Sequence, residues 1–560
     1  MRYKGIVVIL IIFALVVSRF VFLEQDLPTQ RLTTMNETDQ YWYLSPAFNW
    51  QYANLDNAPC FPSDVRLLYD IFQNLFTYPF LLIFGNTLFA IKFAIAILSL
   101  LCLLVFYDIL TLLNIRLNSI LFAMIVFGFD FMQLVSARVQ NPVIYSMFGC
   151  LVLFWIMLKY LASSKANKQK WLLTLGAWSC FIVFFIYIFN LFAAAAAFTF
   201  ILIEAIKNKK PILKPLLILG SGFVIMFLFY NVFTYLTVER TIIDFINSLK
   251  NFAGGEDFRF IEEVNKSPWV KLKELIGGYF LINFFRLNLA YLVLLPILLG
   301  VIVKKSIKGD MVLSFILLIL AFSFFQNYTE SNYMSKKMTV LFPFLVIGFF
   351  YTIKDIRIVF NKVVTVGLIA FGVMLALYSF KMTSNPEYYN LWFGSNTSTT
   401  FNTINLACAF AIFVLSLFFV FKPLNHKLMQ ATFLVLLIIP SVFLSATELY
   451  TPTYYHRDAL KVIAKKTENK TLANGYFYML YRNGAPCLIS DKLFLSPIDD
   501  FEQYEFDYLV FETIRDLEKK TMVSNIYTKE IIGLNEKLLL DSVLPFSQEK
   551  YLYLYSRHKN

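Results

Sequence analysis

The stretch FAIKFAIAILSLLCLLVFYDIL, residues 89–110, decides the fold, because its 22 residues carry only two charges, on Lys92 and Asp108. A helix of about 20 mostly apolar residues is long enough to cross the hydrocarbon core of a bilayer. The stretch lies in a predicted span over 87–114, and similar runs recur along the chain. The further predicted spans lie near 5–23, 118–137, 141–160, 171–189, 191–206, 214–236, 283–303, 311–327, 338–353, 363–380, 402–421 and 429–446. The sequence thus predicts an α-helical integral membrane protein with about 13 transmembrane helices.

The composition agrees with a membrane protein and excludes a water-soluble globular one. Hydrophobic residues make up 58% of the 560-residue chain and charged residues only 15%, whereas a soluble domain carries roughly 25% charged residues. The net charge of +12 could suggest nucleic acid as a partner. Nucleic-acid-binding proteins gather such charge on a polar face, but here it lies between apolar runs, so no nucleic-acid partner is expected. The three His residues are too few for a His-rich metal site.

The short loops between the predicted spans alternate in charge. When the N-terminus is put in the cytoplasm, every second loop is basic, as in 165–170, 207–214 and 304–308. Basic short loops stay on the cytoplasmic side of a membrane. An odd number of spans then places the C-terminus outside the cytoplasm. The net positive charge is therefore chiefly a signal of topology.

The composition changes sharply after the last predicted span. The tail 447–560 carries 15 basic and 16 acidic residues and is nearly neutral. Its runs 505–511 (EFDYLVF) and 550–556 (KYLYLYS) alternate as strands do, and 456–466 (HRDALKVIAKK) has the spacing of an amphipathic helix. We therefore predict two domains, a membrane domain over 1–446 and a small extracytoplasmic α/β domain over 447–560.

The first outer loop, 24–86, holds the candidate active site. Glu37 and Asp39 closely follow the first span, so both carboxylates are expected near the membrane surface. Partial burial there raises the pKa of a carboxylate, which suits it to take a proton from a hydroxyl. Aromatic belts and acidic outer loops are also common without any chemistry, so both interpretations stay open at this point. The aromatic residues that follow, whose rings suit packing on a sugar or on lipid, are Tyr41, Trp42 and Tyr43.

Four stretches occur in the order of the motifs of one known superfamily. They are DQYWY at 39–43, LLY at 67–69, SARVQNPVIYSMFGCLVLF at 136–154 and YMSKKMTVLFPFL at 333–345. With these motifs the chain resembles the polyprenyl-phosphate-sugar glycosyltransferases of the GT-C superfamily. Within that superfamily it is most similar to the bacterial aminoarabinose transferases of lipid A and to the protein O-mannosyltransferases.

The resemblance implies a GT-C fold in a bacterial inner (plasma) membrane and an activity in the cell envelope. A hexosyl or pentosyl group would pass from a polyprenyl-phosphate donor to an acceptor hydroxyl on the outer face, with inversion. Asp39 or Glu37 would be the base. The acceptor would be a lipid, a glycan or a protein, as in lipopolysaccharide or protein glycosylation, and membrane lipids would surround the donor. The resemblance implies no certain cofactor and leaves a divalent metal ion open.

A leaving phosphate needs positive charge nearby as its negative charge grows. Arg138 is the first choice, because it stands in the matching turn between two apolar helices. An arginine can bind phosphate bidentately, whereas a lysine acts as a point charge. These cations would also suit lipid headgroups, to which Lys and Arg side chains snorkel. The other candidate cations at the outer boundary are Arg66, Arg286, Lys336 and Lys337.

One acid lies inside a predicted span. Asp130 sits within 118–137, where a carboxylate is costly and is a functional hypothesis by default. Its structural alternative is an ion pair with Arg138 or Lys92, which we favour.

The chain also departs from the superfamily pattern. The expected pair of adjacent acids is broken, because Asn36 precedes Glu37 and Gln40 follows Asp39. Val143 stands where an acid often follows the proline of the later turn. Two rival functions therefore stay open. One is a transporter or flippase of a lipid-linked saccharide, and the other is a catalytically inactive assembly partner.

Overall fold

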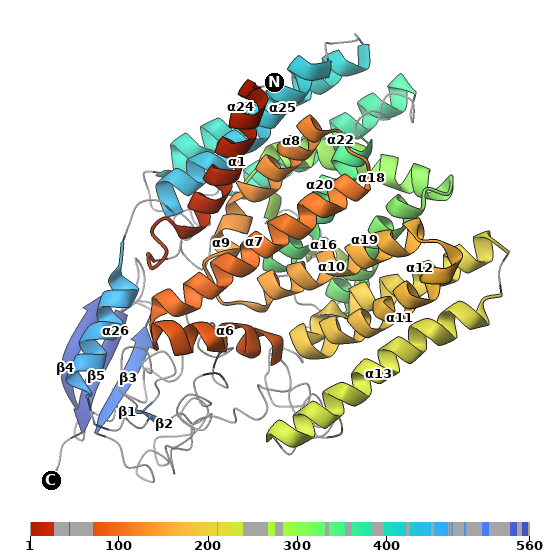
Figure 1. The fold of residues 1–560 in the computed structure, drawn as a ribbon. Helices are drawn as coiled ribbons and strands as arrows, with labels where there is room; N and C mark the ends of the chain where they lie inside the picture. Colours follow the sequence, from red (N-terminus) through yellow and green to blue (C-terminus); the bar gives the residue numbers. More distant parts are fainter. Residues whose placement is uncertain are drawn as a thin grey trace.

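The structure of the chain is a computed structural model. Figure 1 shows a bundle of long helices with a small sheet at one end. The structure describes residues 2–26, 44, 47, 71–209, 211–238, 243, 267–274, 284–330, 335–352, 361–383, 397–421, 426–449, 453–468, 470, 472–473, 487–488, 507–513, 538–545 and 551–557.

Apolar helices form the membrane part. Within the described residues, nine helices are long and apolar enough to cross a membrane, and five shorter apolar helices accompany them. The helices that match the predicted spans are α1 (Arg2–Phe20), α7 (Leu88–Leu112), α8 (Leu117–Gly128) with α9 (Phe131–Ser136), α10 (Pro142–Ala162), α11 (Lys165–Phe181), α12 (Leu191–Lys207), α13 (Leu213–Val238), α18 (Leu289–Ile307), α19 (Met311–Glu330), α20 (Ser335–Thr352), α22 (Lys362–Thr383), α24 (Thr397–Phe421) and α25 (His426–Leu444). Each predicted span has its helix, so the predicted helical membrane architecture is confirmed.

Two of the predicted spans are shaped by polar side chains. The span 118–137 breaks into α8 and α9 because the Asp130 carboxylate accepts from the backbone N–H of Met132 and Gln133 and so caps α9. Between α11 and α12 the chain reverses through a π turn and a 3-10 turn. Asn190 closes this reversal by donating from Nδ2 to the Ile182 carbonyl oxygen at 2.9 Å.

Glycines allow α11 and α13 to pack backbone to backbone. A Cβ added at Gly222 would overlap the Leu173 carbonyl oxygen, and one added at Gly176 would overlap the Leu219 carbonyl oxygen. Small residues permit such close approach of helices in membranes, where dispersion contacts between helices drive their association. The rest of α13 is mostly exposed, as expected of a helix that faces lipid.

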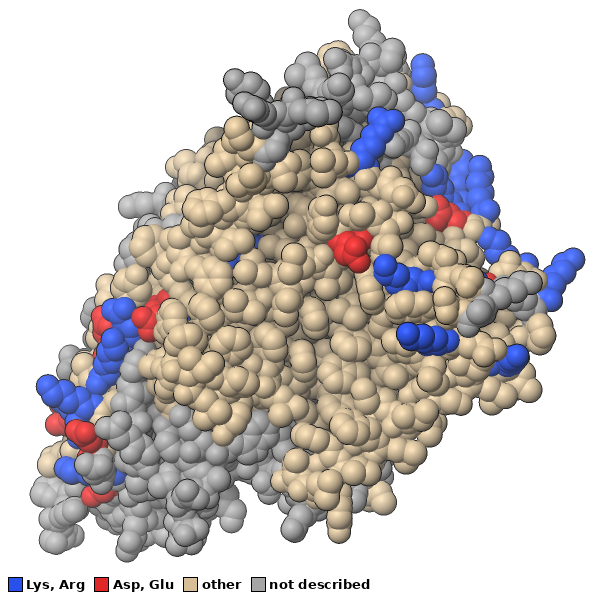
Figure 2. All heavy atoms as spheres, viewed as in Figure 1, with Lys and Arg blue, Asp and Glu red and all other residues tan. Residues whose placement is uncertain are grey.

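The charges mark the two ends of the bundle. Figure 2 shows that the broad middle of the visible face carries few charged side chains. Most of the Lys, Arg, Asp and Glu side chains on this face lie near the sheet at the lower left or along the right and upper edge. An apolar band between two charged edges is the surface expected of an integral membrane protein.

The C-terminal part of the chain forms a five-stranded sheet in the order β2-β1-β3-β5-β4. Strands β1, β2 and β3 are parallel, and β5 pairs antiparallel with β3 and β4. The elements of this part are α26 (Tyr455–Lys466), β1 (Leu472–Ala473), β2 (Cys487–Leu488), β3 (Tyr508–Thr513), β4 (Leu538–Pro545) and β5 (Tyr551–Arg557). The π turn η4 (Ser445–Leu449) precedes them, and the two shorter helices α6 (Ile71–Phe84) and α16 (Pro268–Glu274) lie in the earlier long loops of the chain. The predicted amphipathic helix, both predicted strands and the small α/β domain are confirmed.

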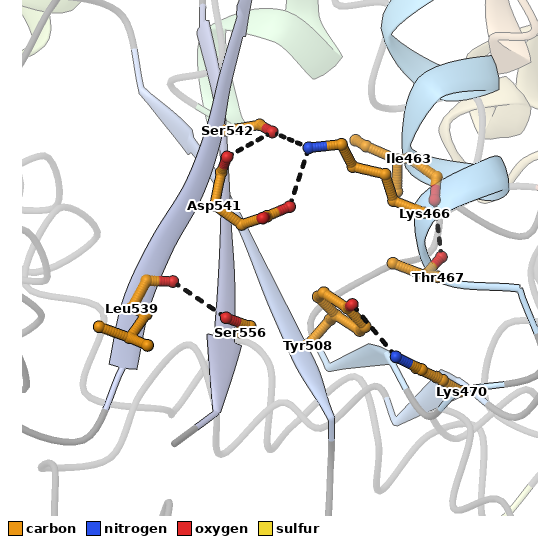
Figure 3. A network of polar contacts seen from close by, with 9 residues as sticks. All are labelled: Ile463, Lys466, Thr467, Lys470, Tyr508, Leu539, Asp541, Ser542 and Ser556. Atoms are coloured by element: carbon orange, nitrogen blue, oxygen red, sulfur yellow. Dashed lines mark hydrogen bonds and ion pairs between the residues drawn. The ribbon is translucent and has the colours of Figure 1, made fainter. Parts of the chain in front are cut away.

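Helix α26 packs on this sheet through both apolar and polar contacts. Leu460 and Ile463 of the helix are buried in the same contiguous core as Val510 and Leu554 of the strands. At the rim, Lys466 Nζ lies 2.9 Å from the Asp541 carboxylate and also bonds the Ser542 hydroxyl, as Figure 3 shows. The helix and the sheet therefore form one unit.

Candidate functional site

The first long loop, which holds most of the predicted site, begins at one end of the bundle, which we call the domain end. It is the end at which α1 finishes and beside which the C-terminal sheet lies (Figure 1). The chain leaves α1 through a turn at residues 21–25 and reaches Asp26, which contacts the start of α26 directly. The first long loop and the α/β domain therefore start from the same place.

Asp26 caps a helix that begins more than 400 residues later in the chain. Its Oδ2 accepts from the Tyr455 N–H and its Oδ1 from the His456 N–H, both at 2.9 Å. The position that precedes α26 is Tyr454, whose side chain makes no capping hydrogen bond, so Asp26 supplies the cap that the helix lacks. The Asp26 N–H also donates to the Thr453 carbonyl oxygen at 2.9 Å. Together these three bonds form a junction that we call the Asp26 clamp.

Two neighbouring contacts support the clamp. The Arg457 guanidinium lies 3.6 Å from the Glu24 carboxylate, with both side chains about a quarter exposed. Lys92 of α7 donates from Nζ to the Gln25 carbonyl oxygen at 2.6 Å, and it is completely buried. The segment 24–26 is therefore held on one side by the membrane bundle and on the other by the α/β domain.

Two buried arginines tie the end of α1 to the α8–α10 connection. Arg138 donates to the carbonyl oxygens of Ser18 and Val21, at 2.9 and 3.1 Å, and to that of Leu134. Carbonyl groups at a helix C-terminus lack intrahelical partners and carry partial negative charge, so a buried guanidinium suits them. Arg19 makes the complementary contact from α1, donating to the Gly128 carbonyl oxygen at 2.6 Å. Arg19 is absent from the predicted cations, although a basic residue in the last turn of an apolar span is visible in the sequence.

The favoured ion pair of Asp130 is wrong. Arg138 and Lys92 donate to backbone carbonyl oxygens instead, and Asp130 caps α9. The carboxylate satisfies two backbone N–H groups that no helical carbonyl can reach. A break of the predicted span at this residue was not expected from the sequence.

Helix α6 carries a buried polar network beneath the first long loop. Asn74 Oδ1 accepts from the Ala47 N–H at 2.9 Å, which ties the loop to the helix. Thr77 Oγ1 lies 3.1 Å from the Tyr145 hydroxyl, which donates to Gln140 Oε1 at 3.0 Å. All five residues are fully buried. Ala47 of the first long loop is therefore held by a buried polar network that links α6 to Gln140 and Tyr145.

An apolar cavity lies inside the bundle, between α8, α18, α20 and α25. The cavity has a volume of about 50 Å³. The only polar group among the lining side chains is the Tyr291 hydroxyl. The lining residues are Val126, Phe285, Tyr291, Leu294, Leu295, Leu298, Phe342, Leu345, Val346, Phe349, Phe350 and Leu437. This lining suits a short segment of a hydrocarbon chain.

Two solved structures align with nearly the whole chain. The structure of ArnT from Cupriavidus metallidurans in the apo state covers 99% of this chain and 98% of its own, with a TM-score of 0.57 and 15% sequence identity. The chain has the fold of ArnT. The structure of the same ArnT bound to undecaprenyl phosphate covers 98% of this chain and 97% of its own, with a TM-score of 0.56 and 14% identity. The predicted architecture, a membrane helix bundle followed by a small α/β domain, is therefore shared with ArnT. No family model and no curated protein matches the sequence.

Most of the predicted site residues lie outside the described part of this ArnT-like fold. Arg286 is described, is 4% exposed, and its backbone carbonyl oxygen accepts from Asn405 Nδ2 at 2.7 Å. Arg138 is described and buried at the end of α1, so these two cations are both at buried positions. The side chains that lie outside the described residues are Glu37, Asp39, Tyr41, Trp42, Tyr43, Arg66, Lys336 and Lys337. Their predicted roles stay predictions.

The described residues offer no metal centre. No group of three or more His, Cys, Asp or Glu side chains within the described part of the chain is close enough to hold an ion. The buried carboxylate of Asp130 accepts hydrogen bonds from the N-terminus of α9. A divalent metal ion therefore stays an open prediction.

Proposed function

We propose that the protein transfers a sugar from a polyprenyl-phosphate donor to an acceptor hydroxyl outside the cytoplasm. The observation that carries the proposal is the apolar cavity inside the bundle, between α8, α18, α20 and α25. It lies in a fold shared with an ArnT whose structure holds undecaprenyl phosphate. A polyprenyl chain is a hydrocarbon, so burial of its surface among Leu, Val and Phe side chains is favourable, at about 25 cal/mol per Å².

The placement of polar groups indicates how a donor would be oriented in the cavity. Asp130 follows Val126 of the cavity wall and lies toward the domain end, as does the end of α1. The tail of a donor in the cavity would thus point into the bundle and its head toward the first long loop. The basic loops at 165–170 and 304–308 support a cytoplasmic N-terminus, with the domain end on the outer face of a bacterial inner membrane.

The reaction would be a direct displacement with inversion. Asp39, or Glu37, takes the proton of the acceptor hydroxyl as its oxygen attacks the anomeric carbon. The bond between that carbon and the phosphate oxygen breaks, and its electron pair leaves with the polyprenyl phosphate. Positive charge near the phosphate stabilises the developing negative charge. Tyr41, Trp42 and Tyr43 would pack on the sugar or the acceptor.

Among the described cations, Arg286 suits the phosphate better than Arg138, the first choice from the sequence. It directly follows Phe285 of the cavity wall and is buried. Arg138 ranks second, because its guanidinium already donates to three carbonyl oxygens and so has fewer N–H groups left for a phosphate. Arg66, Lys336 and Lys337 keep their predicted role as further cations near the phosphate.

The proposal is tested with the purified full-length protein in lipid nanodiscs. The substrates are a polyprenyl-phosphate sugar and a lipid, glycan or peptide acceptor, and the readout is release of polyprenyl phosphate. Asp39→Asn or Glu37→Gln is expected to lower kcat by about 10²- to 10⁴-fold, the usual contribution of a general base. A wild-type protein that never consumes such a donor contradicts the function, and full activity of both variants contradicts the base.

The cavity is tested in the same assay by filling it. Leu345→Trp is expected to weaken donor binding by about tenfold or more, because Leu345 lines the cavity. Leu377→Trp is the matched control, since Leu377 is 52% exposed on α22. Equal donor KM values for both variants would place the hydrocarbon chain elsewhere.

A further inference from the structure

Several polar side chains stand about one helical turn from residues that line the apolar cavity. Thr339 precedes Phe342 of the cavity wall by three residues, and Asn288 precedes Tyr291 by three. Positions three or four apart share one face of a helix. Asp130 follows Val126 by four residues at the turn that leads out of α8. We call Asp130, Gln133, Asn288 and Thr339 the acceptor ring, because their side-chain oxygens can accept hydrogen bonds; the name does not refer to the acceptor substrate.

The orientation of the two amides in the acceptor ring is fixed by their partners. Gln133 Nε2 donates to the Thr339 carbonyl oxygen at 3.1 Å. That carbonyl has no helical partner, because the residue four positions later is Pro343, which lacks an N–H. Asn288 Nδ2 donates to the Leu437 carbonyl oxygen at 2.5 Å. Only the NH₂ group of an amide can make such a bond, so both amide oxygens are turned away from these contacts.

Three buried atoms of the acceptor ring have no hydrogen-bond partner among the described residues. They are Gln133 Oε1, Asn288 Oδ1 and Thr339 Oγ1, on side chains that are at least 98% buried. A buried threonine in a helix usually donates to the carbonyl oxygen one turn back, as Thr352 does to Gly348 in the same helix. Leaving a buried polar group unsatisfied is unfavourable, so these three atoms are available to a ligand that forms hydrogen bonds.

The charge of the acceptor ring selects the ligand. Asp130 is 5% exposed, and none of the described cations forms an ion pair with it. A carboxylate beside two amide oxygens and a hydroxyl repels an anion and attracts hydrogen-bond donors. The phosphate of a lipid-linked donor therefore does not fit the acceptor ring, whereas the hydroxyl or amino groups of a sugar do.

We propose that the acceptor ring binds the sugar of the donor through the hydroxyl or amino groups of that sugar. This inference rests on the proposed transferase function. The tail of the donor lies in the cavity and the sugar meets the acceptor ring. The phosphate, which joins the two, lies between them, near Arg286. The acceptor ring would thus set which sugar the protein accepts.

Thr339→Val tests the proposal, because valine keeps the shape of threonine and removes only the hydroxyl. We expect an unchanged or slightly raised Tm and a donor KM raised about threefold to tenfold, the value of one hydrogen bond. The matched control is Thr352→Val at the far end of the same helix. Since the Thr352 hydroxyl is already bonded within the helix, this control should leave KM unchanged and should not raise Tm.

Asp130→Asn distinguishes the two kinds of sugar group. Asparagine caps a helix about as well as aspartate, so the break between α8 and α9 should persist. The KM for a polyprenyl-phosphate amino sugar should rise more than tenfold if an ammonium group meets Asp130. The KM for the corresponding neutral sugar should rise less than tenfold if hydroxyl groups do.

The outcomes separate this inference from the proposed function. A wild-type protein that consumes the donor, with an unchanged KM in both Thr339→Val and Asp130→Asn, overturns the acceptor ring alone. A wild-type protein that consumes neither donor overturns the transferase function, and the acceptor ring falls with it. A Thr339→Val variant with a lowered Tm would mean that the hydroxyl serves the fold, which also overturns the inference.

Discussion

The Asp26 clamp makes a strong prediction about the stability of the α/β domain. Asp26→Ala removes both carboxylate oxygens from the N-terminus of α26 and leaves the N–H groups of Tyr455 and His456 without acceptors. Both bonds are 2.9 Å long and the Asp26 side chain is 5% exposed. Water therefore reaches the vacated position poorly, and the lost bonds are not readily replaced.

The magnitude follows from these two bonds. A hydrogen bond to a charged group contributes about 1.5–3 kcal/mol net, and loss of a helix cap costs about 0.5–2 kcal/mol. We take about 2–4 kcal/mol for the pair, since the two contributions overlap. At 1.4 kcal/mol for each factor of ten, opening of the junction becomes about 30- to 1,000-fold more frequent.

Hydrogen exchange measured by mass spectrometry on peptides that cover 453–466 checks this prediction. The amides of Tyr455 and His456 should exchange about 30- to 1,000-fold faster in Asp26→Ala. Peptides from the buried middle of α10 should be unchanged. Asp458→Asn is the matched control, because Asp458 lies in the first turn of the same helix and is 61% exposed.

The result that would refute the reasoning is equal exchange in the wild type and Asp26→Ala. It would mean that the junction is held by apolar contacts alone, among them those of Leu460 and Ile463. An equal effect of Asp458→Asn would also refute it, since the charge of the first turn would then matter more than the two bonds from Asp26.

Two further predictions concern the membrane bundle. Arg138→Met should lower the free energy of unfolding by about 2–4 kcal/mol, because three carbonyl oxygens lose their donor; an unchanged Tm with lost donor binding would instead assign Arg138 to the phosphate alone. Gly222→Ala should lower stability by about 1–3 kcal/mol through overlap with the Leu173 carbonyl oxygen. Gly220→Ala, whose Cβ would meet nothing within 4 Å, should leave stability unchanged or slightly higher. Thermal unfolding in one detergent compares all three variants, and equal Tm values for the two glycine variants would contradict the close contact.

Local polar chemistry could be predicted only in part. The aromatic and acidic run at 37–43 was a reasonable candidate site from the sequence, but it lies outside the described residues. Asp130 was rightly seen as unusual in an apolar span, yet its partner was wrong. The sequence showed a carboxylate near two cations, whereas the fold offers it two free N–H groups at the start of α9. Whether the carboxylate meets a cation or a backbone N–H depends on where the predicted span breaks.

The sequence by itself determined the membrane helices and the nature of the tail. An apolar run of about 20 residues must satisfy its backbone hydrogen bonds internally in lipid, so its helical state follows from composition alone. Alternation in 505–511 and 550–556 likewise sufficed for β3 and β5, because the two faces of a strand differ in burial. These features depend on neighbours in the sequence, and they agree with the structure.

The tertiary structure alone decided the partners of the buried polar groups. Asp26 caps a helix at His456, 430 residues later in the chain. The Thr339 carbonyl oxygen lacks a helical partner because Pro343 has no N–H, and it accepts instead from Gln133, 206 residues earlier. A buried donor or acceptor needs a partner, but the sequence does not say which distant backbone group will come within 3 Å. The junction and the acceptor ring both consist of such long-range pairs, and they therefore appear only once the helices are packed.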